Sequence, residues 1–338
     1  MFKLIKSLFL LALIAGLAAV GGLWWYAHEP LVLPTKSVDF TVRPGSNVRQ
    51  IARDVSAAGV KVQPDILALL ARLQGSATNL KAGSYVLEGR VTPLDLIEKM
   101  SKGDVTMASV SLIEGWTFRQ FRAALDKHAN LEHTTAGLTD RQVLQMLADA
   151  EQKTLDFVHP EGMFFPDTYL FAKKSKDLEV LRRAWRAMEK NLTQAWEQRA
   201  SGVPYKTPYE ALIMASIVEK ETGRASDRPT IAGVFVNRLR KGMLLQTDPT
   251  VIYGMGEAYD GNIRKRDLQT DTPYNTYMRG GLPPTPIAMP GLASLAAALN
   301  PAPTKAIFFV ARGDGTSEFS ETLEAHNRAV NKYQRGGK

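Results

Sequence analysis

The chain has 338 residues, of which 45% are hydrophobic and 22% are charged, and its formal net charge is +8. This composition allows one large or two modest hydrophobic cores, and it excludes a disordered or collagen-like chain. Because the sequence contains no cysteine, it also excludes disulfides, thiolate metal sites and cysteine nucleophiles.

The positive charge is scattered along the chain. The densest basic cluster is Arg264-Lys265-Arg266, and no aromatic residues are interleaved with it, so we expect no nucleic-acid partner. The motifs HExxH, GxSxG and GxxxxGK[ST] are absent, which argues against a zinc protease, a serine hydrolase and a nucleotide-binding protein. We therefore expect neither a metal ion nor an organic cofactor.

The first element is an apolar stretch at residues 7–27, long enough to cross a bilayer as a helix. Lys3 and Lys6 precede it, which predicts a cytoplasmic N-terminus at residues 1–6. It ends at Trp24-Trp25-Tyr26, typical of an interfacial aromatic belt. A cleaved signal peptide is the alternative, but these bulky residues stand where its small-residue cleavage site would fall. We expect a retained anchor with the rest of the chain outside the membrane.

A prolyl linker at residues 28–37 leads to a small module at residues 38–90. Its pattern predicts, in order, a strand, a turn, two helices and a returning strand: residues 38–42, 44–46, 46–58 with Ser46 as N-cap, 64–73 and 81–87. This β-α-α-β order resembles a LysM-type module, a fold that grips N-acetylglucosamine chains. A packing domain without sugar affinity remains the alternative.

The remaining residues, 91–338, form a larger domain of mixed helices and strands, so the predicted fold class is α+β. The patterns predict helices at residues 92–101, 139–151 and 177–201, and a strand at 105–113 that runs into a turn at 114–117.

The most informative helix spans residues 208–222, between a capping box at Thr207–Glu210 and a stop at Gly223. Residues 211–218 are apolar on nearly every face, so the helix is expected to be buried. Glu219 and Glu221 stand at its C-terminal end and point about 160° apart, which prevents them from acting as a facing pair. Two solvated acids at a helix end are the alternative interpretation.

Polar and aromatic residues gather among the glycines and prolines of residues 242–254, 271–277 and 281–286. Sugars offer apolar ring faces and many hydroxyls, so aromatic rings with neutral amides suit a carbohydrate groove. Rigid structural loops are the alternative.

At these segments the chain resembles the endolytic murein transglycosylase (MltG/YceG-like) family. The resemblance covers essentially the whole chain, including residues 325–327. Its longest motifs are His159-Pro-Glu-Gly-Met-Phe-Phe-Pro-Asp-Thr-Tyr169, Ala215-Ser-Ile-Val-Glu-Lys-Glu-Thr222, Leu245-Gln-Thr-Asp-Pro-Thr-Val-Ile-Tyr-Gly254, Tyr274-Asn-Thr-Tyr277 and Gly281-Leu-Pro-Pro284.

The resemblance implies a single-pass protein of the inner cell membrane whose catalytic domain lies outside the cytoplasm. Such enzymes are lyases that cleave the MurNAc–GlcNAc β-1,4 bond of nascent peptidoglycan strands. They leave 1,6-anhydro-MurNAc ends and are thought to terminate strand elongation beside the synthases, the penicillin-binding proteins. The family's catalytic glutamate is placed at Glu219.

In that chemistry, Glu219 protonates the glycosidic oxygen and then takes the proton of the C6 hydroxyl that attacks C1. A second carboxylate is not required. The residues predicted to hold the sugar are Gln246, Asp248, Tyr253, Tyr274, Asn275, Tyr277 and Glu161, the last with a structural turn as the alternative. Two other functions remain open: a non-catalytic peptidoglycan-binding scaffold, and a hydrolase that uses Asp248 as base.

Overall fold

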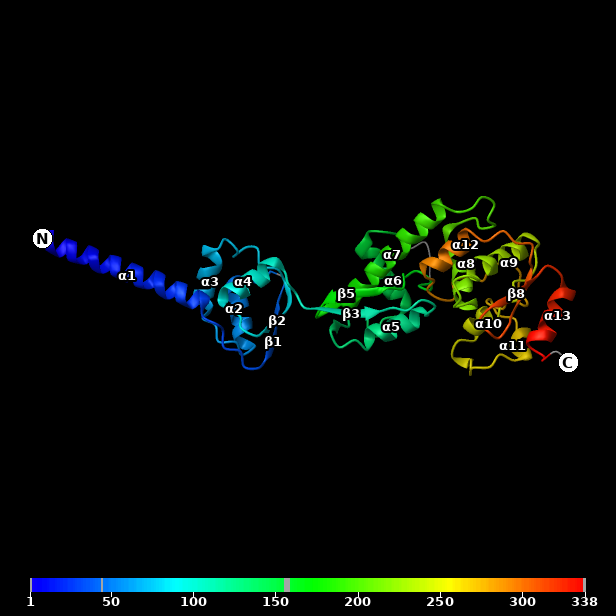
Figure 1. Cartoon of the computed structure of the whole chain (residues 1–338), viewed down its shortest axis with the longest axis horizontal. Helices are drawn as coiled ribbons and strands as arrows, with labels where there is room; N and C mark the ends of the chain where they lie inside the picture. Colours follow the sequence, from blue (N-terminus) through cyan, green and yellow to red (C-terminus); the bar gives the residue numbers. More distant parts are fainter. Residues whose placement is uncertain (1, 44, 155–158, 337–338) are drawn as a thin grey trace. The chain divides into compact units, whose positions relative to one another are not determined.

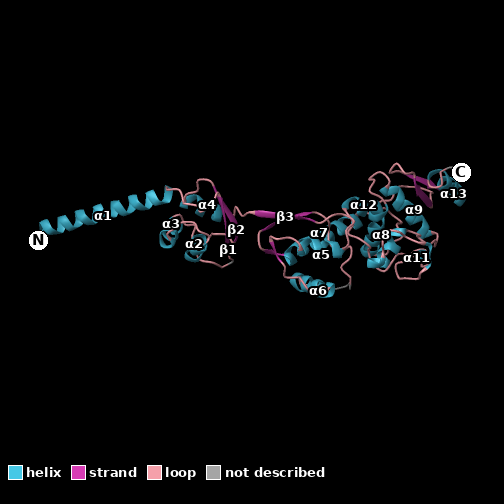
Figure 2. Ribbon diagram, turned by 90° about the horizontal axis from the view of Figure 1, so that it is seen from below, coloured by secondary structure: helices cyan, strands magenta, loops and turns pink. Residues whose placement is uncertain are grey.

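The computed structural model describes residues 2–43, 45–154 and 159–336, and the chain divides into two compact units (Figure 1). The first unit comprises residues 1–108 together with 170–175, and the second comprises 109–169 and 176–338. Both helices and strands are present, and the N-terminal helix is apolar, in agreement with the predicted mixed fold (Figure 2).

The N-terminal helix α1 spans Phe2–His28, and its segment Ile5–His28 is long and apolar enough to cross a membrane. This helix is compatible with a single-pass membrane anchor. Near its end, Ala27 is buried in the core of the first unit, and so is Leu31 just beyond. The segment predicted as a linker therefore begins within that core.

The first unit has the predicted β-α-α-β order, extended by one helix: β1 (Ser37–Val42), α2 (Val48–Ala57), α3 (Pro64–Leu73), β2 (Gly83–Glu88) and α4 (Pro93–Lys102). β1 and β2 pair antiparallel, with Ser37 opposite Glu88 and Val42 opposite Gly83. The inward side chains of β1 and β2 pack against one face of α2 and one face of α3, and together they form one apolar core.

Helix α2 is capped by Asn47 and not by Ser46, which corrects the prediction. The Asn47 side chain accepts a hydrogen bond from the Gln50 N–H at 2.9 Å. Asn47 has extended backbone directly before the first helical residue, which is the geometry that lets a side-chain oxygen reach the third N–H of a helix. Pro44, in the predicted turn, lies outside the described residues.

The second unit is mostly helical. Its helices are α5 (Phe118–Asp126), α6 (Asp140–Glu151), α7 (Asp177–Glu197), α8 (Pro208–Glu221), α9 (Arg228–Arg240), α10 (Asp248–Met255), α11 (Lys265–Gln269), α12 (Leu292–Leu299) and α13 (Leu323–Tyr333), with a 3₁₀ turn at Gly256–Ala258. The remaining strands form three pairs: β3 (Met107–Ser111) with β5 (Thr168–Ala172), β4 (Leu131–Glu132) with β6 (Ser175–Lys176), and β7 (Phe308–Ala311) with β8 (Ser317–Ser320). Strands β3, β5 and β6 each contain residues of both units, whereas β4, β7 and β8 belong to the second unit alone.

Helix α8 lies at the centre of this unit, packed against α7, α9, α10 and α12. Every residue from Ala211 to Val218 is buried, which confirms the prediction from its apolar sequence. Thr207 caps the helix by accepting the Glu210 N–H, whereas the Glu210 carboxylate bonds the N–H of Lys206 instead of completing a capping box. Because α8 is held on all sides, the acids at its C-terminal end are held in fixed positions.

Candidate active site

Glu219 and Glu221 face different surroundings, as the helical spacing predicts. Glu219 is only 6% exposed; its Oε2 accepts the Gly291 N–H at 2.9 Å, and its Oε1 lies 3.5 Å from Nη2 of Arg228. One turn earlier on the same face, the hydroxyl of Ser216 accepts the N–H of Ile287 at 3.0 Å. The segment at residues 286–291 therefore runs along the Glu219 face of α8 and is hydrogen-bonded to it.

The turn at residues 114–117 closes over the same face. Gly115 and Trp116 exchange backbone hydrogen bonds with Met289, at 2.9 and 2.8 Å, and Lys220 donates to the Gly115 carbonyl at 3.2 Å. A side chain on Gly291 would meet the Glu114 carboxylate, since an ideal Cβ there lies 1.9 Å from Oε1. The Glu219 carboxylate thus accepts a backbone N–H and faces the guanidinium of Arg228.

Glu221 lies on the other side of α8 and meets the segment that begins α10. Its carboxylate accepts a hydrogen bond from the Thr247 hydroxyl. Burial and the neighbouring Asp248 raise the pKa of Glu221, the Thr247 hydrogen bond and Arg238 oppose the shift, and the net pKa is about 7. Glu221 therefore keeps a proton near neutral pH, as a general acid must.

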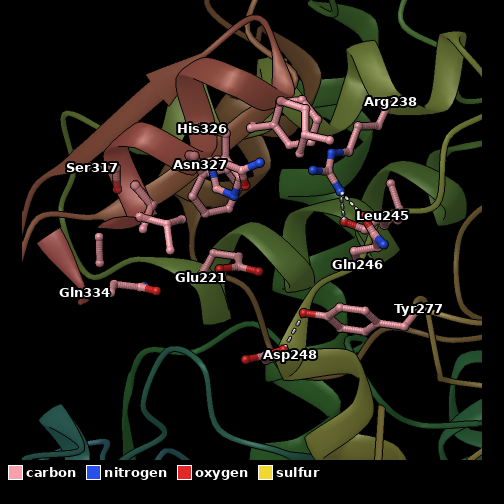
Figure 3. A pocket seen from close by; sticks show the side chains of 16 residues that line it. Glu221, Arg238, Leu245, Gln246, Asp248, Tyr277, Ser317, His326, Asn327 and Gln334 are labelled. Carbon is pink, nitrogen blue, oxygen red and sulfur yellow. Dashed lines mark hydrogen bonds between the residues drawn. The ribbon is translucent and has the colours of Figure 1, made fainter. Parts of the chain in front are cut away.

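A pocket of about 630 Å³ opens beside Glu221 (Figure 3). Asp248 and Tyr277 lie on one side of it, and His326 and Asn327 of α13 lie on the other, with Glu221 between them. The remaining lining residues include Arg238, Leu245, Gln246, Phe308, Phe309, Ser317, Leu323 and Gln334. Glu219 is not among the lining residues, so the two acids serve different environments.

Three of the predicted sugar-binding residues meet in this pocket: Gln246, Asp248 and Tyr277. The Tyr277 hydroxyl donates to Asp248 at 2.6 Å, which fixes both side chains. Gln246 has a left-handed backbone with φ of 52°, a conformation that costs a non-glycine residue about 1–2 kcal/mol. Its amide oxygen accepts from Arg238 at 3.3 Å, and its N–H bonds the Thr276 carbonyl at 3.1 Å, so surrounding contacts hold the strained conformation.

Arg238 positions this wall of the pocket. Its guanidinium donates to the carbonyls of Ile307 and Leu245 at 2.7 and 2.9 Å, joining the loop before α10 to the loop before β7. Burial lowers the pKa of Arg238, although Tyr277 and Glu221 counteract this effect. Nothing in the local sequence singles out Arg238, because an arginine near the end of a helix is usually a surface residue.

The predicted residues Glu161, Tyr253 and Tyr274 form a second group that does not line this pocket. Glu161 is 3% exposed and accepts from the Phe118 N–H at 2.9 Å and the Tyr253 hydroxyl at 3.0 Å. Burial raises the pKa of Glu161 to about 7. The rings of Tyr253 and Tyr274 meet edge to face, with centroids 4.9 Å apart, and Tyr274 pairs with the hydroxyl of Thr285 at 2.8 Å.

Asn275, also predicted to bind sugar, is completely buried. Its amide nitrogen donates to the carbonyls of Asp267, Leu268 and Thr270, at 3.2, 3.0 and 2.7 Å, and its oxygen accepts from the Tyr277 N–H at 2.9 Å. These bonds use the hydrogen-bonding capacity of the amide and hold the loop that presents Tyr277.

His326 lies in α13, about a hundred residues along the sequence from Glu221. Its ring stacks on Phe308 with centroids 5.0 Å apart, and burial and Arg238 lower the pKa of its imidazole. Its buried Nδ1 has no hydrogen-bond partner among the described residues. The sequence placed His326 and Asn327 within the family resemblance, but no local pattern indicates that α13 reaches Glu221.

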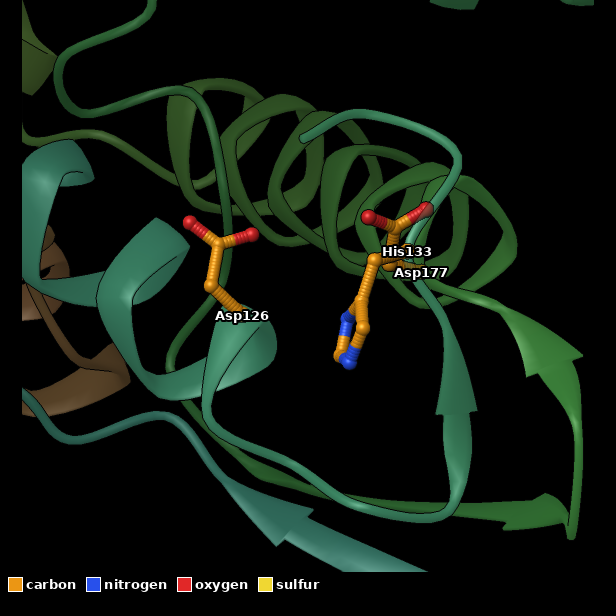
Figure 4. Close-up of side chains that lie close together, drawn as sticks. All are labelled: Asp126, His133 and Asp177. Atoms are coloured by element: carbon orange, nitrogen blue, oxygen red, sulfur yellow. The ribbon is translucent and has the colours of Figure 1, made fainter. Parts of the chain in front are cut away.

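Among the described residues, one group has metal-ligand spacing: Asp126, His133 and Asp177, whose ligand atoms lie within 4.8 Å of one another (Figure 4). The Asp177 carboxylate already accepts hydrogen bonds from Thr134, Thr135 and Leu178, and the two threonines contribute both hydroxyls and N–H groups. Burial raises the pKa of Asp177, but these hydrogen bonds outweigh it and lower the pKa overall. Asp177 thus anchors the start of α7, and its occupied lone pairs fit a metal ion poorly.

The comparisons with known proteins identify the family of this chain. The model of the YceG-like family matches residues 40–332. The chain belongs to the YceG-like family. An endolytic murein transglycosylase of Bacillus subtilis is 32% identical over 329 residues, covering 93% of this chain and 91% of that protein.

Other members of the YceG-like family are also similar. An endolytic murein transglycosylase of Streptococcus pneumoniae is 29% identical over 88% of this chain, and the chain spans 58% of that longer protein. The crystal structure of a YceG-like protein from Listeria monocytogenes superposes with a TM-score of 0.57 at 30% identity, covering 87% of this chain and 98% of that one.

Proposed function

We propose that this protein is an endolytic murein transglycosylase, a lyase that cleaves the MurNAc–GlcNAc β-1,4 bond inside nascent peptidoglycan strands and thereby limits their elongation. Membership of the YceG-like family and relatives with that name support the proposal. The observation that carries it is Glu221: an acid with a pKa of about 7 in a pocket whose other polar groups include the amide of Gln246, the carboxylate of Asp248 and the phenol of Tyr277.

The proposal gives the acid/base role to Glu221, with Glu219, predicted from the sequence, as the alternative. A general acid must carry a proton at neutral pH and must reach the substrate. Glu221 meets both requirements in the pocket of Figure 3. Glu219 lies outside this pocket, where the Gly291 N–H and Arg228 already occupy its oxygens.

In the reaction, Glu221 donates its proton to the glycosidic oxygen as the bond to C1 breaks. The resulting carboxylate accepts the proton of the C6 hydroxyl as that oxygen bonds to C1, so no water is consumed and a 1,6-anhydro sugar forms. The nucleophile belongs to the same sugar ring, which makes the attack intramolecular. In this proposal, Asp248, held by Tyr277, faces the sugar ring on which positive charge develops.

Gln246, Asp248 and Tyr277 are the proposed sugar contacts, with Phe308 and His326 supplying a flat surface for a ring face. The other residues predicted to hold sugar act indirectly in this proposal. Tyr253 and Tyr274 support the loop walls, and Asn275 and Glu161 hold backbone, since their polar groups are bonded within the protein.

We further propose that α1 spans the inner membrane with residues 1–6 in the cytoplasm and both units outside. The charge of Lys3 and Lys6 and the aromatic end of α1 support this orientation. The first unit would bind glycan as a LysM-like module, which its β-α-α-β order supports. Penicillin-binding proteins that synthesise the strands are the expected protein partners.

The test is mass spectrometry of uncrosslinked nascent glycan strands incubated with the full chain in detergent, beside matched Glu221→Gln and Glu219→Gln variants. We expect anhydro-ended fragments from the wild type and from Glu219→Gln but not from Glu221→Gln. The reverse pattern would assign the acid to Glu219. Ordinary reducing ends would make the protein a hydrolase with Asp248 as base, and strand binding without cleavage would make it a scaffold.

A further inference from the structure

Helix α3 of the first unit is apolar on two faces. One face, with Leu67, Ala68, Leu70 and Ala71, is buried in the core. On the other face, Ile66, Leu69 and Leu73 are 36%, 45% and 67% exposed. These three residues follow one another at helical spacing and form a single stripe. Adjacent exposed apolar side chains on one helix face are typical of a surface that contacts a membrane, a ligand or another protein.

The stripe adjoins α1. A groove of about 410 Å³ lies between the two helices, lined by Ile66 and Leu69 from α3 and by Ala19, Val20, Gly22, Leu23 and Tyr26 from α1. No charged side chain lines it. Figures 1 and 2 both show α3 beside the C-terminal end of α1.

The contact between α1 and α3 is specific. The Tyr26 hydroxyl accepts the N–H of Gln63, the residue that precedes α3, at 2.9 Å. Leu23 and Tyr26 pack against the core of the first unit, and Ala27 is part of it. The depth of α3 along α1 is therefore set by packing.

That depth can be compared with the membrane. Trp24, Trp25 and Tyr26 form the aromatic belt, which marks the level of the lipid headgroups. Val20 lies four residues earlier, about 6 Å deeper at the rise of an α-helix. Because the groove that Leu69 lines reaches from Tyr26 to Val20, the exposed face of α3 opens toward the part of α1 that lies deeper than the belt.

We propose that α3 is embedded in the outer surface of the bilayer, with Ile66, Leu69 and Leu73 in contact with lipid acyl chains that also fill the groove against α1. The inference rests on the proposed anchoring by α1. The continuity of the groove with the lipid-facing surface of α1 identifies the occupant, and amphipathic helices commonly bury one face about 5–10 Å into this boundary. The first unit is then attached to the membrane by two helices.

The chain has no cysteine, so single nitroxide labels can be placed without background. The full chain, reconstituted into phosphatidylethanolamine–phosphatidylglycerol vesicles, would carry one label at a time. Leu69→Cys and Leu73→Cys report on the stripe, and Leu17→Cys, exposed on α1, reports on the anchor. Arg43→Cys, exposed directly after the end of β1, is the aqueous control.

Collisions with oxygen and with a water-soluble nickel chelate measure the depth of each label. We expect the labels at Leu17, Leu69 and Leu73 to favour oxygen, and the label at Arg43 to favour nickel by several-fold. A lipid-exposed Leu17 with water-exposed Leu69 and Leu73 would overturn the inference while leaving the anchor intact. A water-exposed Leu17 would overturn the anchor itself. Labels on α3 shielded from both reagents would show that protein, a partner or a second copy, covers the stripe, and would also overturn it.

Discussion

The two sides of the last turn of α8 differ in what surrounds their carboxylates. On one side, Glu219 is bonded by the backbone of Gly291 and faces Arg228. On the other, Glu221 meets a hydroxyl, a second carboxylate and an open pocket, and its pKa is about 7. The two acids stand two residues apart in one motif, yet their environments differ, and the motif alone does not reveal this difference. In our proposal, Glu221 is the proton donor and Glu219 has a structural role.

The largest effect that this comparison predicts is for Glu221→Gln. The variant keeps the shape of the side chain but cannot donate a proton, so we expect the rate of anhydro-end formation to fall about 100-fold or more. Initial rates from labelled strands would measure it. A Glu221→Gln protein that is folded and retains the wild-type rate would contradict the assignment.

Glu219→Gln is expected to act on stability instead. Replacing a buried carboxylate by an amide weakens its bond from Gly291 and its attraction to Arg228, so the free energy of unfolding should fall by about 1–2 kcal/mol. Urea unfolding of the full chain in detergent measures this, and the cleavage rate should stay within a few-fold of wild type. A rate loss larger than that of Glu221→Gln would reverse the two roles.

Tyr277→Phe should weaken substrate handling moderately. It removes the hydrogen bond that fixes Asp248, which is worth about 1 kcal/mol, so we expect a roughly five-fold loss in kcat/KM. Tyr274→Phe is the matched control, because Tyr274 bonds Thr285 outside this pocket. Equal losses from the two variants would contradict a special role for the pocket.

The dependence of the cleavage rate on pH also tests the role of Glu221. Because the pKa of Glu221 is raised, the protonated acid persists to about pH 7, and the rate should decline as the pH rises through that value. The contribution of Glu221 to the free energy of unfolding should change with pH in the same direction. It is complete below the pKa of an exposed carboxyl, about 4.5, and is lost as the pH rises to about 7.

Thr247→Val tests the origin of this pKa. The Thr247 hydroxyl lowers the pKa of Glu221, so its removal should move the declining limb of the rate profile to higher pH with little change in the maximal rate. Thr250→Val is the control, because the Thr250 hydroxyl bonds a backbone carbonyl and not Glu221. A limb that stays in place would mean that another group titrates.

The smallest effect is expected from chelation. The Asp177 carboxylate is saturated by hydrogen bonds from Thr134 and Thr135, so the group with Asp126 and His133 should not depend on a metal ion. We expect EDTA to leave both the cleavage rate and the thermal unfolding temperature unchanged. A lower unfolding temperature that zinc or calcium restores would contradict this.

Features that depend on neighbouring residues could be predicted from the sequence. The length and apolarity of α1, the β-α-α-β order of the first unit and the buried interior of α8 follow from periodicity and caps. The opposite directions of Glu219 and Glu221 follow from helix geometry alone. Ser46 failed as a cap because the adjacent Asn47 offers an oxygen with the same reach.

The surroundings of each acid could not be predicted, because they come from distant segments. Residues 286–291 enclose Glu219, while α13, about a hundred residues from α8, supplies one side of the pocket. An asparagine in a polar loop was expected to bind sugar, but the same residue type can be buried and hold the loop through hydrogen bonds, as Asn275 does. The residue type shows that such side chains form hydrogen bonds, but only the fold shows which partners they bond.

The burial of Ala27 and Leu31 in the first unit has a consequence for how the protein can evolve. With α1 in the membrane as proposed, no flexible linker separates the bilayer from the first unit, so the distance between this unit and the lipid is fixed. Extra residues inserted after His28 would disrupt a core before they lengthened a tether.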